Sequence, residues 1–248
     1  VLQDLPEKLE TNYYSVLTEE QKKIYLAYLR QMREEIAQMD TAAFRKNRIS
    51  ILAGLTRLRQ ICCDPRLFVE DYEGTSGKLE QVKDLIQAAK ENGRRVLLFS
   101  QFTSMLSIIE EELAQEGIET FYLRGSTPPQ DRLSMVDAFN SGEKDVFLIS
   151  LKAGGTGLNL TGADTVILYD LWWNPAVEEQ AAGRAHRIGQ KKVVEVWRMI
   201  AEGTIEERMD ALQQEKRELF QKVIQGNEAQ LNQMTEEDIR LILSIGEE

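Results

Sequence analysis

The sequence predicts an open, doubly wound α/β fold, in which helices cover both faces of a mostly parallel sheet and a helical attachment precedes it. Two patterns between about residues 78 and 200 support this prediction. Strand-like and amphipathic helical segments alternate, as the crossovers between parallel strands require. Several strand-like segments are also near-continuous apolar runs, which is typical of strands buried on both faces of a parallel sheet. The expected strands are residues 95–100, 119–123, 145–151, 164–170 and 193–199.

The region before this sheet is predicted to be helical. Thr18 and Gln21 form the pattern of a capping box, in which Thr18 caps a first helix and Gln21 reaches back. A second helix is expected from about Thr41 to Asp64-Pro65, where the proline stops it. A polar, glycine-containing linker then follows over residues 71–77.

The region after the sheet is also predicted to be helical. A charged helix is expected from Thr204 to about Gln225, and an acidic segment with apolar residues at the chain end suits a small docked helix. Those apolar residues are Ile239, Leu241, Ile242 and Leu243. We therefore expect three parts, which are a helical lead-in and linker (1–75), an α/β domain (76–225) and an acidic C-terminal tail (226–248).

The charge of the chain neither requires nor excludes a nucleic-acid partner. The formal net charge is −11, but residues 201–248 hold 12 Asp or Glu against 5 Lys or Arg, so they account for −7 of it. A basic groove on one face of the rest is compatible with this distribution. No apolar run approaches the roughly 20 residues needed to cross a bilayer, and we expect no membrane partner. The chain begins at Val1 without an initiator Met, so we expect it to be part of a longer protein.

Two features that suggest a metal or phosphate site are predicted to be structural. Cys62 and Cys63 are neighbours without Cys or His partners at ligand spacing, so we expect small, reduced thiols and no metal site. The segment Gly74–Leu79 resembles a phosphate-binding loop, but only two residues separate its glycines and Leu79 replaces the hydroxyl residue. We interpret it as a flexible linker and the start of a helix. We therefore expect no cradle for the phosphates of ATP in this chain.

A glycine-rich turn and an arginine-rich segment are the candidates for phosphate chemistry. The turn Lys152–Asn159 carries three glycines, which let a backbone approach a phosphate or ribose, although such turns are structural about as often as functional. Gln180, Arg184 and Arg187 have the spacing i, i+4, i+7, so a helix would place them on one face. Two guanidinium groups presented together suit phosphate oxygens. Spacing alone, however, favours a solvated helix face.

Two tryptophans and a histidine complete the candidates. Trp172 and Trp173 precede Asn174-Pro175, directly after the fourth expected strand. We expect Trp172 to pack in the core, whereas for Trp173 a core position and a position facing a ligand or groove are equally favoured. His186, the only histidine, is expected to be a hydrogen-bonded structural residue rather than a general base.

Five segments of the chain occur in an order and at distances that point to a known family. They are Leu97–Leu106, Leu123–Arg132, Ser150–Leu160, Tyr169–Pro175 and Gln180–Gln190. Together they resemble the second RecA-like lobe of Swi/Snf-type ATPases, a branch of the superfamily 2 helicase-like proteins, and the resemblance covers nearly the whole chain. Arg57–Phe68 also resembles the helical lead-in of that lobe. The double Trp differs from the commoner acid–Trp pair of the family.

The resemblance implies a role for each matched residue. Arg184 and Arg187 would be arginine fingers that reach the γ-phosphate of ATP. The nucleotide side of that cleft would be lined by Gly155, Thr156, Gly157 and Gln180. The residues that would face the DNA backbone and minor groove are Ser100, Gln101, Arg124, Gly125, Ser126, Lys152 and Trp173. ATP would bind with Mg²⁺, and the Mg²⁺ ligands are expected on a first lobe outside this chain.

The function implied by the resemblance is that of the second motor lobe of an ATP-dependent double-stranded-DNA translocase or remodeller. Its expected partners are double-stranded DNA, the N-terminal RecA-like lobe of the same protein and a DNA-bound protein target. The isolated lobe is expected to hydrolyse essentially no ATP. Two alternatives stay open, a strand-separating helicase lobe and a non-catalytic interaction module that retains the fold. The compact spacing of the motifs favours a prokaryotic, nucleoid-associated cytoplasmic protein over a nuclear one.

Overall fold

The computed structural model describes residues 5–151, 157–216 and 234–244, and the chain forms two compact units. We call the first the sheet unit, and it consists of Val1–Tyr13, Glu80–Asp170 and Val177–Met199. We call the second the helical unit, and it consists of Tyr14–Leu79, Leu171–Ala176 and Ile200–Glu248. Both units are therefore assembled from segments that are far apart in the sequence.

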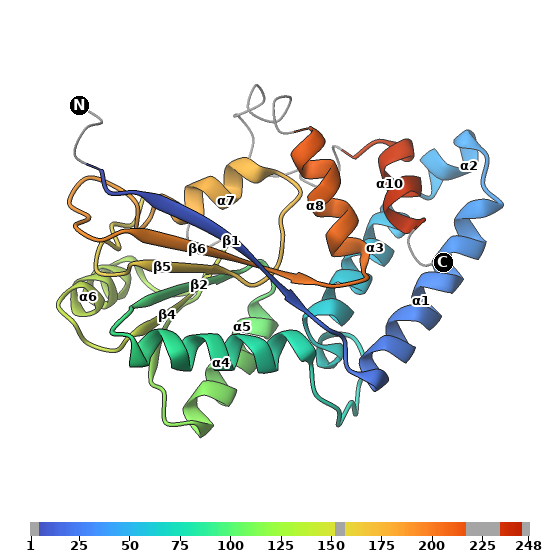
Figure 1. Cartoon of the computed structure of the whole chain (residues 1–248). Coiled ribbons are helices and arrows are strands. Elements are labelled where there is room, and N and C mark those ends of the chain that lie inside the picture. Colours follow the sequence, from blue (N-terminus) through green and yellow to red (C-terminus); the bar gives the residue numbers. More distant parts are fainter. Residues whose placement is uncertain (1–4, 152–156, 217–233, 245–248) are drawn as a thin grey trace. The chain divides into compact units, whose positions relative to one another are not determined.

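The described residues form one six-stranded sheet in the order β1-β6-β5-β2-β4-β3. All of its strands run parallel, which confirms the predicted fold class (Figure 1). The strands are β1 (Lys8–Ser15), β2 (Val96–Ser100), β3 (Thr120–Leu123), β4 (Val146–Ser150), β5 (Thr165–Leu168) and β6 (Val194–Ala201). From the central β2 the chain builds β3 and β4 on one side, and it then crosses to the other side for β5 and β6. This reversal makes the carboxyl end of β2 the switch point, where ligands gather in open α/β sheets.

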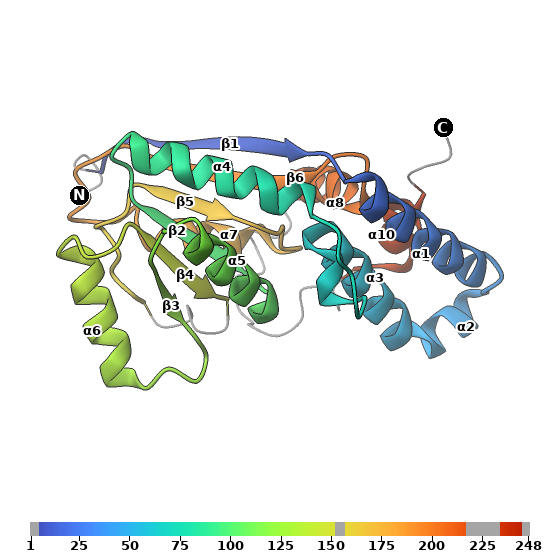
Figure 2. The same ribbon diagram turned by 90° about the horizontal axis from the view of Figure 1, so that it is seen from below.

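The three central strands explain why the fold could be predicted. Every residue of β2, β4 and β5 is buried, as their continuous apolar runs indicate. Ser100 of β2 pairs with Ser150 of β4, and Phe99 pairs with Leu168 of β5. Their carboxyl ends therefore lie next to one another. Figure 2 shows β4 and β5 as arrows that point the same way.

Strand β1 was not predicted from the sequence. Most of its side chains are half-buried or exposed, and it pairs with β6 at the sheet edge. Its backbone joins the sheet where the Val194 amide donates to the carbonyl of Glu7 at 3.0 Å. An edge strand with such a mixed pattern carries little of the apolar signal that identifies a buried strand.

Helices cover both faces of the sheet. They are α4 (Gly77–Glu91), α5 (Thr103–Gln115), α6 (Pro129–Asn140) and α7 (Pro175–Ala182). In Figure 1, α4 and α5 lie below the strands and α7 lies above them. In the described part of the chain, no helix has both the length and the apolar character that a membrane crossing needs.

The helical unit combines helices from both ends of the sequence. They are α1 (Glu19–Ala37), α2 (Thr41–Lys46), α3 (Arg48–Cys63), the 3-10 helix η1 (Pro65–Leu67), α8 (Ile205–Glu215) and α10 (Glu236–Leu243). The predicted capping box of Thr18 and Gln21 begins α1, and Asp64 ends α3 before the proline. The predicted second helix is in fact two, because Asn47 ends α2 and also precedes α3.

The predicted C-terminal helix is confirmed as α10. Thr235 caps it, and Asp238 completes a capping box by accepting from the Thr235 amide at 2.9 Å. Ile239, Ile242 and Leu243 are buried in the helical unit, whereas Leu241 is 42% exposed. The helix expected after Thr204 is described as α8 up to Glu215, and residues 217–233 lie outside the described part.

The segment that resembles a phosphate loop is packed inside the helical unit. The Ser76 hydroxyl donates to the Cys63 carbonyl at 2.6 Å, and the Gly77 amide donates to Gln21 Oε1 at 3.2 Å. A Cβ atom on Gly77 would lie 1.8 Å from the carbonyl oxygen of Val16. The predicted helix start at this point is confirmed, but the prediction of a flexible linker is wrong, because these contacts fix the segment.

Candidate functional site

The carboxyl ends of β2 and β5 are tied together by one buried carboxylate. Asp170 follows β5 and is 1% exposed. It accepts hydrogen bonds from the Ser100 hydroxyl, from Gln101 Nε2 at 2.7 Å and from the Gln101 amide at 3.3 Å. This arrangement fixes the direction in which the chain leaves β2 at the switch point. The sequence analysis did not single out Asp170, although an acid at the end of an apolar strand is a signal that could have found it.

We call the residues at the carboxyl ends of β2, β3 and β5 the rim, and Ser100 has a structural position in it. Its side chain is fully buried, and its hydroxyl also accepts from the Phe102 amide at 3.1 Å. The hydroxyl is therefore engaged inside the rim, instead of lying on the surface as its expected DNA contact requires. Gln101 is half-buried beside it and borders the surface.

The turn after β3 presents a polar surface. Arg124, Gly125 and Ser126 are all exposed, as their expected contact with DNA requires. The guanidinium carbon of Arg124 lies 3.7 Å from the centre of the Tyr122 ring, and Arg124 Nη2 lies 2.8 Å from Glu110. The side chain therefore has a defined position, with cation–π and ionic contacts to its own unit.

The predicted single helix carrying Gln180 and the two arginines is wrong. Helix α7 ends at Ala182, so Gln180 lies exposed on its last turn while Arg184 and Arg187 lie in the turns that follow. The helix ends where Gly183, a poor helix former, follows it. We call residues 183–190 the arginine turn.

The arginine turn is held against the segment that leaves the glycine-rich turn. The Leu160 amide donates to the Arg184 carbonyl at 2.9 Å. Gln190 is buried and its Nε2 donates to the carbonyls of Ala163 at 2.7 Å and Ala185 at 3.0 Å. The carbonyls of Arg184 and Ala185 thus accept from Leu160 and Gln190 instead of from the amides of a continuing helix, which fixes an irregular backbone at this position.

Arg187 lies beside the backbone of the glycine-rich turn, and its charge acts on Arg184. Arg187 Nη1 donates to the carbonyls of Gly157 at 3.2 Å and Leu158 at 3.1 Å. Burial lowers the pKa of Arg184, and the positive charge of Arg187 lowers it further. Two half-buried cations that repel one another form a site that an anion would stabilise. The pair therefore fits the charge of a nucleotide phosphate.

Three of the predicted site residues cannot be placed. Lys152, Gly155 and Thr156 lie outside the described residues. Of the predicted glycine-rich turn, the structure thus describes Gly157, which contacts Arg187 as above. Among the described residues there is also no group of three His, Cys, Asp or Glu side chains that could hold a metal ion.

Trp173 lies inside the helical unit. It is 2% exposed and belongs to the hydrophobic core of that unit, and Trp172 is 1% exposed. The Trp172 carbonyl accepts from Gln213 Nε2 at 2.8 Å. The core position for Trp172 is therefore confirmed. The expectation that Trp173 faces DNA is not met in this structure, because the ring is enclosed by apolar side chains.

His186 and the cysteines have the structural positions predicted for them. His186 Nε2 donates to the carbonyl of Pro6 at 2.7 Å. Cys62 and Cys63 are buried, and neither is part of a disulfide. Burial raises the pKa of the Cys62 thiol, and the Glu206 carboxylate adds to the increase. A thiol held in its neutral form is a poor nucleophile and a poor metal ligand.

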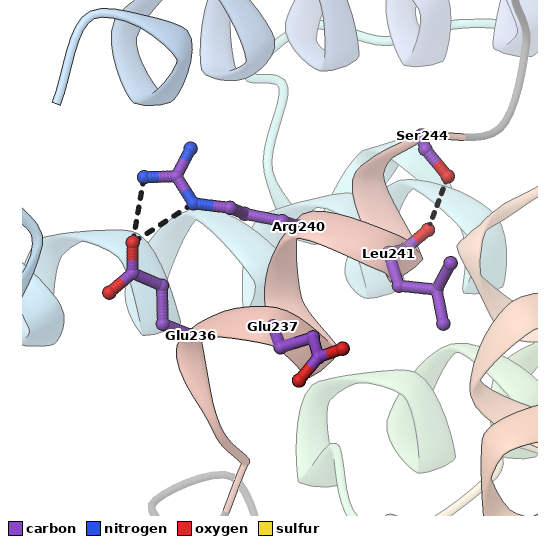
Figure 3. Close-up of a pocket in the computed structure, with 5 residues that line it drawn as sticks. All are labelled: Glu236, Glu237, Arg240, Leu241 and Ser244. Carbon is purple, nitrogen blue, oxygen red and sulfur yellow. Dashed lines mark hydrogen bonds and ion pairs between the residues drawn. The ribbon is translucent and has the colours of Figure 1, made fainter. Parts of the chain in front are cut away.

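A separate hollow lies on α10 in the helical unit (Figure 3). It is lined by Glu236, Glu237, Arg240, Leu241 and Ser244. Arg240 is engaged with Glu236 at 2.8 Å, and the Ser244 hydroxyl donates to the Leu241 carbonyl at 2.6 Å. Because its polar groups serve the helix itself, we assign this hollow no role in binding.

An all-parallel sheet with this strand order and a central switch point, together with an arginine turn packed against the residues that lead into β5, is the architecture of a RecA-like lobe. The family profile described as "Helicase conserved C-terminal domain" matches residues 77–189. The structure resembles the SWI2/SNF2 ATPase C-terminal domain of Sulfolobus solfataricus with a TM-score of 0.77 and 31% identity, covering 97% of this chain and 100% of that one. The chain therefore belongs to the SWI2/SNF2 ATPase family and corresponds to its C-terminal RecA-like lobe.

Two further relatives extend this comparison. The S. solfataricus SWI2/SNF2 ATPase core in complex with double-stranded DNA has a TM-score of 0.81 and 32% identity, over 99% of this chain and 52% of that one. An ATP-dependent helicase of Mycoplasma pneumoniae is 40% identical over 240 residues, which is 96% of this chain and 23% of that protein. The chain thus spans about a quarter of the length of the curated relatives it matches.

Proposed function

We propose that this chain is the second motor lobe of an ATP-driven translocase on double-stranded DNA, with Arg184 and Arg187 as its arginine fingers. The observation that carries the proposal is the arginine turn, in which half-buried Arg187 donates to the Gly157 carbonyl and half-buried Arg184 follows the end of α7 by two residues. Membership of an ATPase family makes the phosphates of ATP the anion that suits this pair.

The two arginines have the chemistry that phosphoryl transfer needs. The charge on the transferred phosphoryl group spreads over its oxygens in the transition state, and an arginine finger that stabilises it contributes about 10³–10⁵ in rate. In our proposal ATP and Mg²⁺ bind on an upstream lobe, which supplies the Mg²⁺ ligands. Arg184 and Arg187 then reach the γ-phosphate when the two lobes close, and hydrolysis releases them.

The proposed DNA surface is the part of the rim that the structure leaves accessible. It consists of Gln101, Arg124, Gly125 and Ser126, and Lys152 joins it by resemblance alone. Small polar groups and a few cations suffice to hold phosphates without reading bases, as a motor that moves along DNA requires. The related ATPase core described in complex with double-stranded DNA supports duplex DNA as the partner. We assign Ser100 and Trp173 supporting positions, because both are buried.

A triplex-displacement assay with the full-length protein tests whether it is a translocase, a strand-separating helicase or neither. A third strand annealed to duplex DNA should be displaced when ATP is added, while the two strands of the duplex stay paired. Separation of the duplex itself would instead indicate a strand-separating helicase. The absence of both, in a folded protein that binds DNA, would indicate an interaction module that keeps the fold without motor activity.

Because the first curated relatives are bacterial, we also propose the bacterial cytoplasm as the location.

A further inference from the structure

A buried ion pair lies under α7, within the sheet unit. Arg198 of β6 and Glu178 of α7 meet at 3.0 Å between Arg198 Nε and Glu178 Oε2, and their side chains are 5% and 10% exposed. Arg198 Nη1 also donates to Asn12 Oδ1 of β1 at 3.1 Å. One guanidinium group thus links a helix and two strands.

Such a pair contributes little to stability, but it restricts the relative position of the two elements that carry it. Removing two charges from water costs several kcal/mol per ion, so a buried pair is often no more stable than an apolar one of similar volume. The two groups do, however, require a defined distance and orientation from one another. The pair therefore restricts where α7 lies on the sheet.

Apolar packing on the buried side of α7 does little to fix its position. Its buried residues are Glu178, Ala181 and Ala182, and two alanines bury little apolar area. A helix of 8 residues is also marginal on its own, so its position must come from tertiary contacts. Glu178 is the only one of the three buried residues that offers a directional contact.

The arginine turn begins directly after α7, so the position of the helix sets the position of the turn. Arg184 is two residues beyond the end of α7 at Ala182. The far part of the turn is tied to the N-terminal segment, since His186 Nε2 donates to the carbonyl of Pro6 at 2.7 Å. A rotation of α7 would therefore displace Arg184 relative to the part of the turn that the contact with Pro6 holds.

We propose that Glu178 and Arg198 are positioning residues, which fix α7 on the sheet and so place the guanidinium groups of Arg184 and Arg187 for catalysis. The proposal rests on the proposed function of the two arginines. It assigns a role to a glutamate and an arginine whose side chains are buried within the sheet unit.

The test measures steady-state ATP hydrolysis by the full-length protein with double-stranded DNA, for Glu178→Gln and for Glu179→Gln. Glu178→Gln keeps the size of the side chain and removes its charge. We expect kcat to fall by about 10²-fold, the effect of a misplacement of roughly 1 Å. The KM for ATP should stay within about twofold, because an arginine finger acts on charge that develops in the transition state.

Glu179→Gln is the matched control. Glu179 is the adjacent residue of the same helix, and its pair with Lys8 is a surface one, with side-chain exposures of 23% for Lys8 and 47% for Glu179. Exposed pairs contribute little. This variant should therefore keep the kcat of the wild type. Thermal unfolding of each variant shows whether it is folded.

A double variant covers the case in which Glu178→Gln does not fold. Glu178→Gln with Arg198→Met leaves no buried charge unpaired, so it should fold. We expect it to show the same loss of kcat. A wild-type kcat in any folded variant that lacks the pair would overturn the proposal. Failure of the double variant to fold would also overturn it, because the pair would then serve the fold itself.

Arg187→Ala, measured in the same assay, separates this proposal from the proposed function. If Arg187→Ala abolishes DNA-stimulated hydrolysis while folded Glu178→Gln keeps it, only the positioning role fails. If Arg187→Ala is as active as the wild type, the proposed function itself fails.

Discussion

Lys78 and Glu206 form an ion pair in the core of the helical unit. Lys78 Nζ lies 2.6 Å from each carboxylate oxygen of Glu206, and the two side chains are 0% and 2% exposed. Glu206 Oε2 also accepts from the Ala201 amide at 3.1 Å. Lys78 follows Gly77 in the segment that resembles a phosphate loop. Its ammonium group is therefore engaged in a buried ion pair, in agreement with the prediction that this segment is structural.

Breaking this pair on one side should destabilise the protein strongly. Lys78→Met leaves the Glu206 carboxylate buried without its cation, which typically costs about 3–5 kcal/mol. Adding Glu206→Leu should recover most of this loss, because both charges are then gone. Urea unfolding measures both variants, with Lys22→Met on the exposed face of α1 as control. A loss below about 1 kcal/mol for Lys78→Met would contradict the assignment.

The same core should make the protein sensitive to alkali. Burial is the main cause that raises the pKa of the Cys62 thiol, and the negative charge of the nearby Glu206 carboxylate raises it further. A group whose pKa is raised in the folded state contributes stability below its unfolded value, about 8.5 for Cys, and this contribution is lost as the pH rises. The free energy of unfolding should thus fall from about pH 8.5 upward. In Cys62→Ala the fall should begin at a higher pH, and an unchanged profile would contradict this explanation.

Gly77 should tolerate no side chain. A Cβ atom there would lie 1.8 Å from the Val16 carbonyl oxygen, which is backbone and cannot rotate away. Overpacking usually costs about 1–3 kcal/mol, and we expect Gly77→Ala to reach or exceed the upper end. Gly125→Ala is the control, because a Cβ atom there meets nothing within 4 Å. Equal stability of the two variants, measured by thermal unfolding, would argue against this packing.

Arg124 should contribute a phosphate contact to DNA binding. Arg124→Ala in the full-length protein is expected to weaken binding to duplexes of any sequence and to reduce the salt dependence of log K by about 0.9. Arg45→Ala, which removes an exposed arginine from α2, provides the control for net charge. Fluorescence anisotropy over a range of salt concentrations measures both slopes. The same slope for wild type and Arg124→Ala would remove Arg124 from the proposed surface.

The central sheet could be predicted because its signal is local. The residues of β2, β4 and β5 are apolar and buried on both faces, so a short window of sequence identifies each strand. Strand β1 was missed because its place depends on pairing with β6, which lies far away in the sequence. The grouping of α8 and α10 with the N-terminal helices likewise depends on distant contacts.

The candidate site was predicted in part for similar reasons. The nearness of Arg184 and Arg187 follows from their spacing, but the irregular backbone after α7 depends on bonds to Leu160 and Ala163. Trp173 gave no signal that separates a core position from a surface one. Asp170, Glu178 and Arg198 were not singled out, because a single charged residue in an apolar segment does not show which partner it meets.

The most direct test of the proposed function is ATP hydrolysis by the full-length protein with and without double-stranded DNA, for wild type, Arg184→Ala, Arg187→Ala and Lys191→Ala. Lys191 is an exposed cation just beyond the arginine turn and serves as the control for lost charge. We expect DNA to stimulate hydrolysis in the wild type and in Lys191→Ala. In the two arginine variants the stimulated rate should fall by about 10³-fold or more while the fold, checked by thermal unfolding, is kept. Stimulated hydrolysis at the wild-type rate in either folded arginine variant would contradict the account.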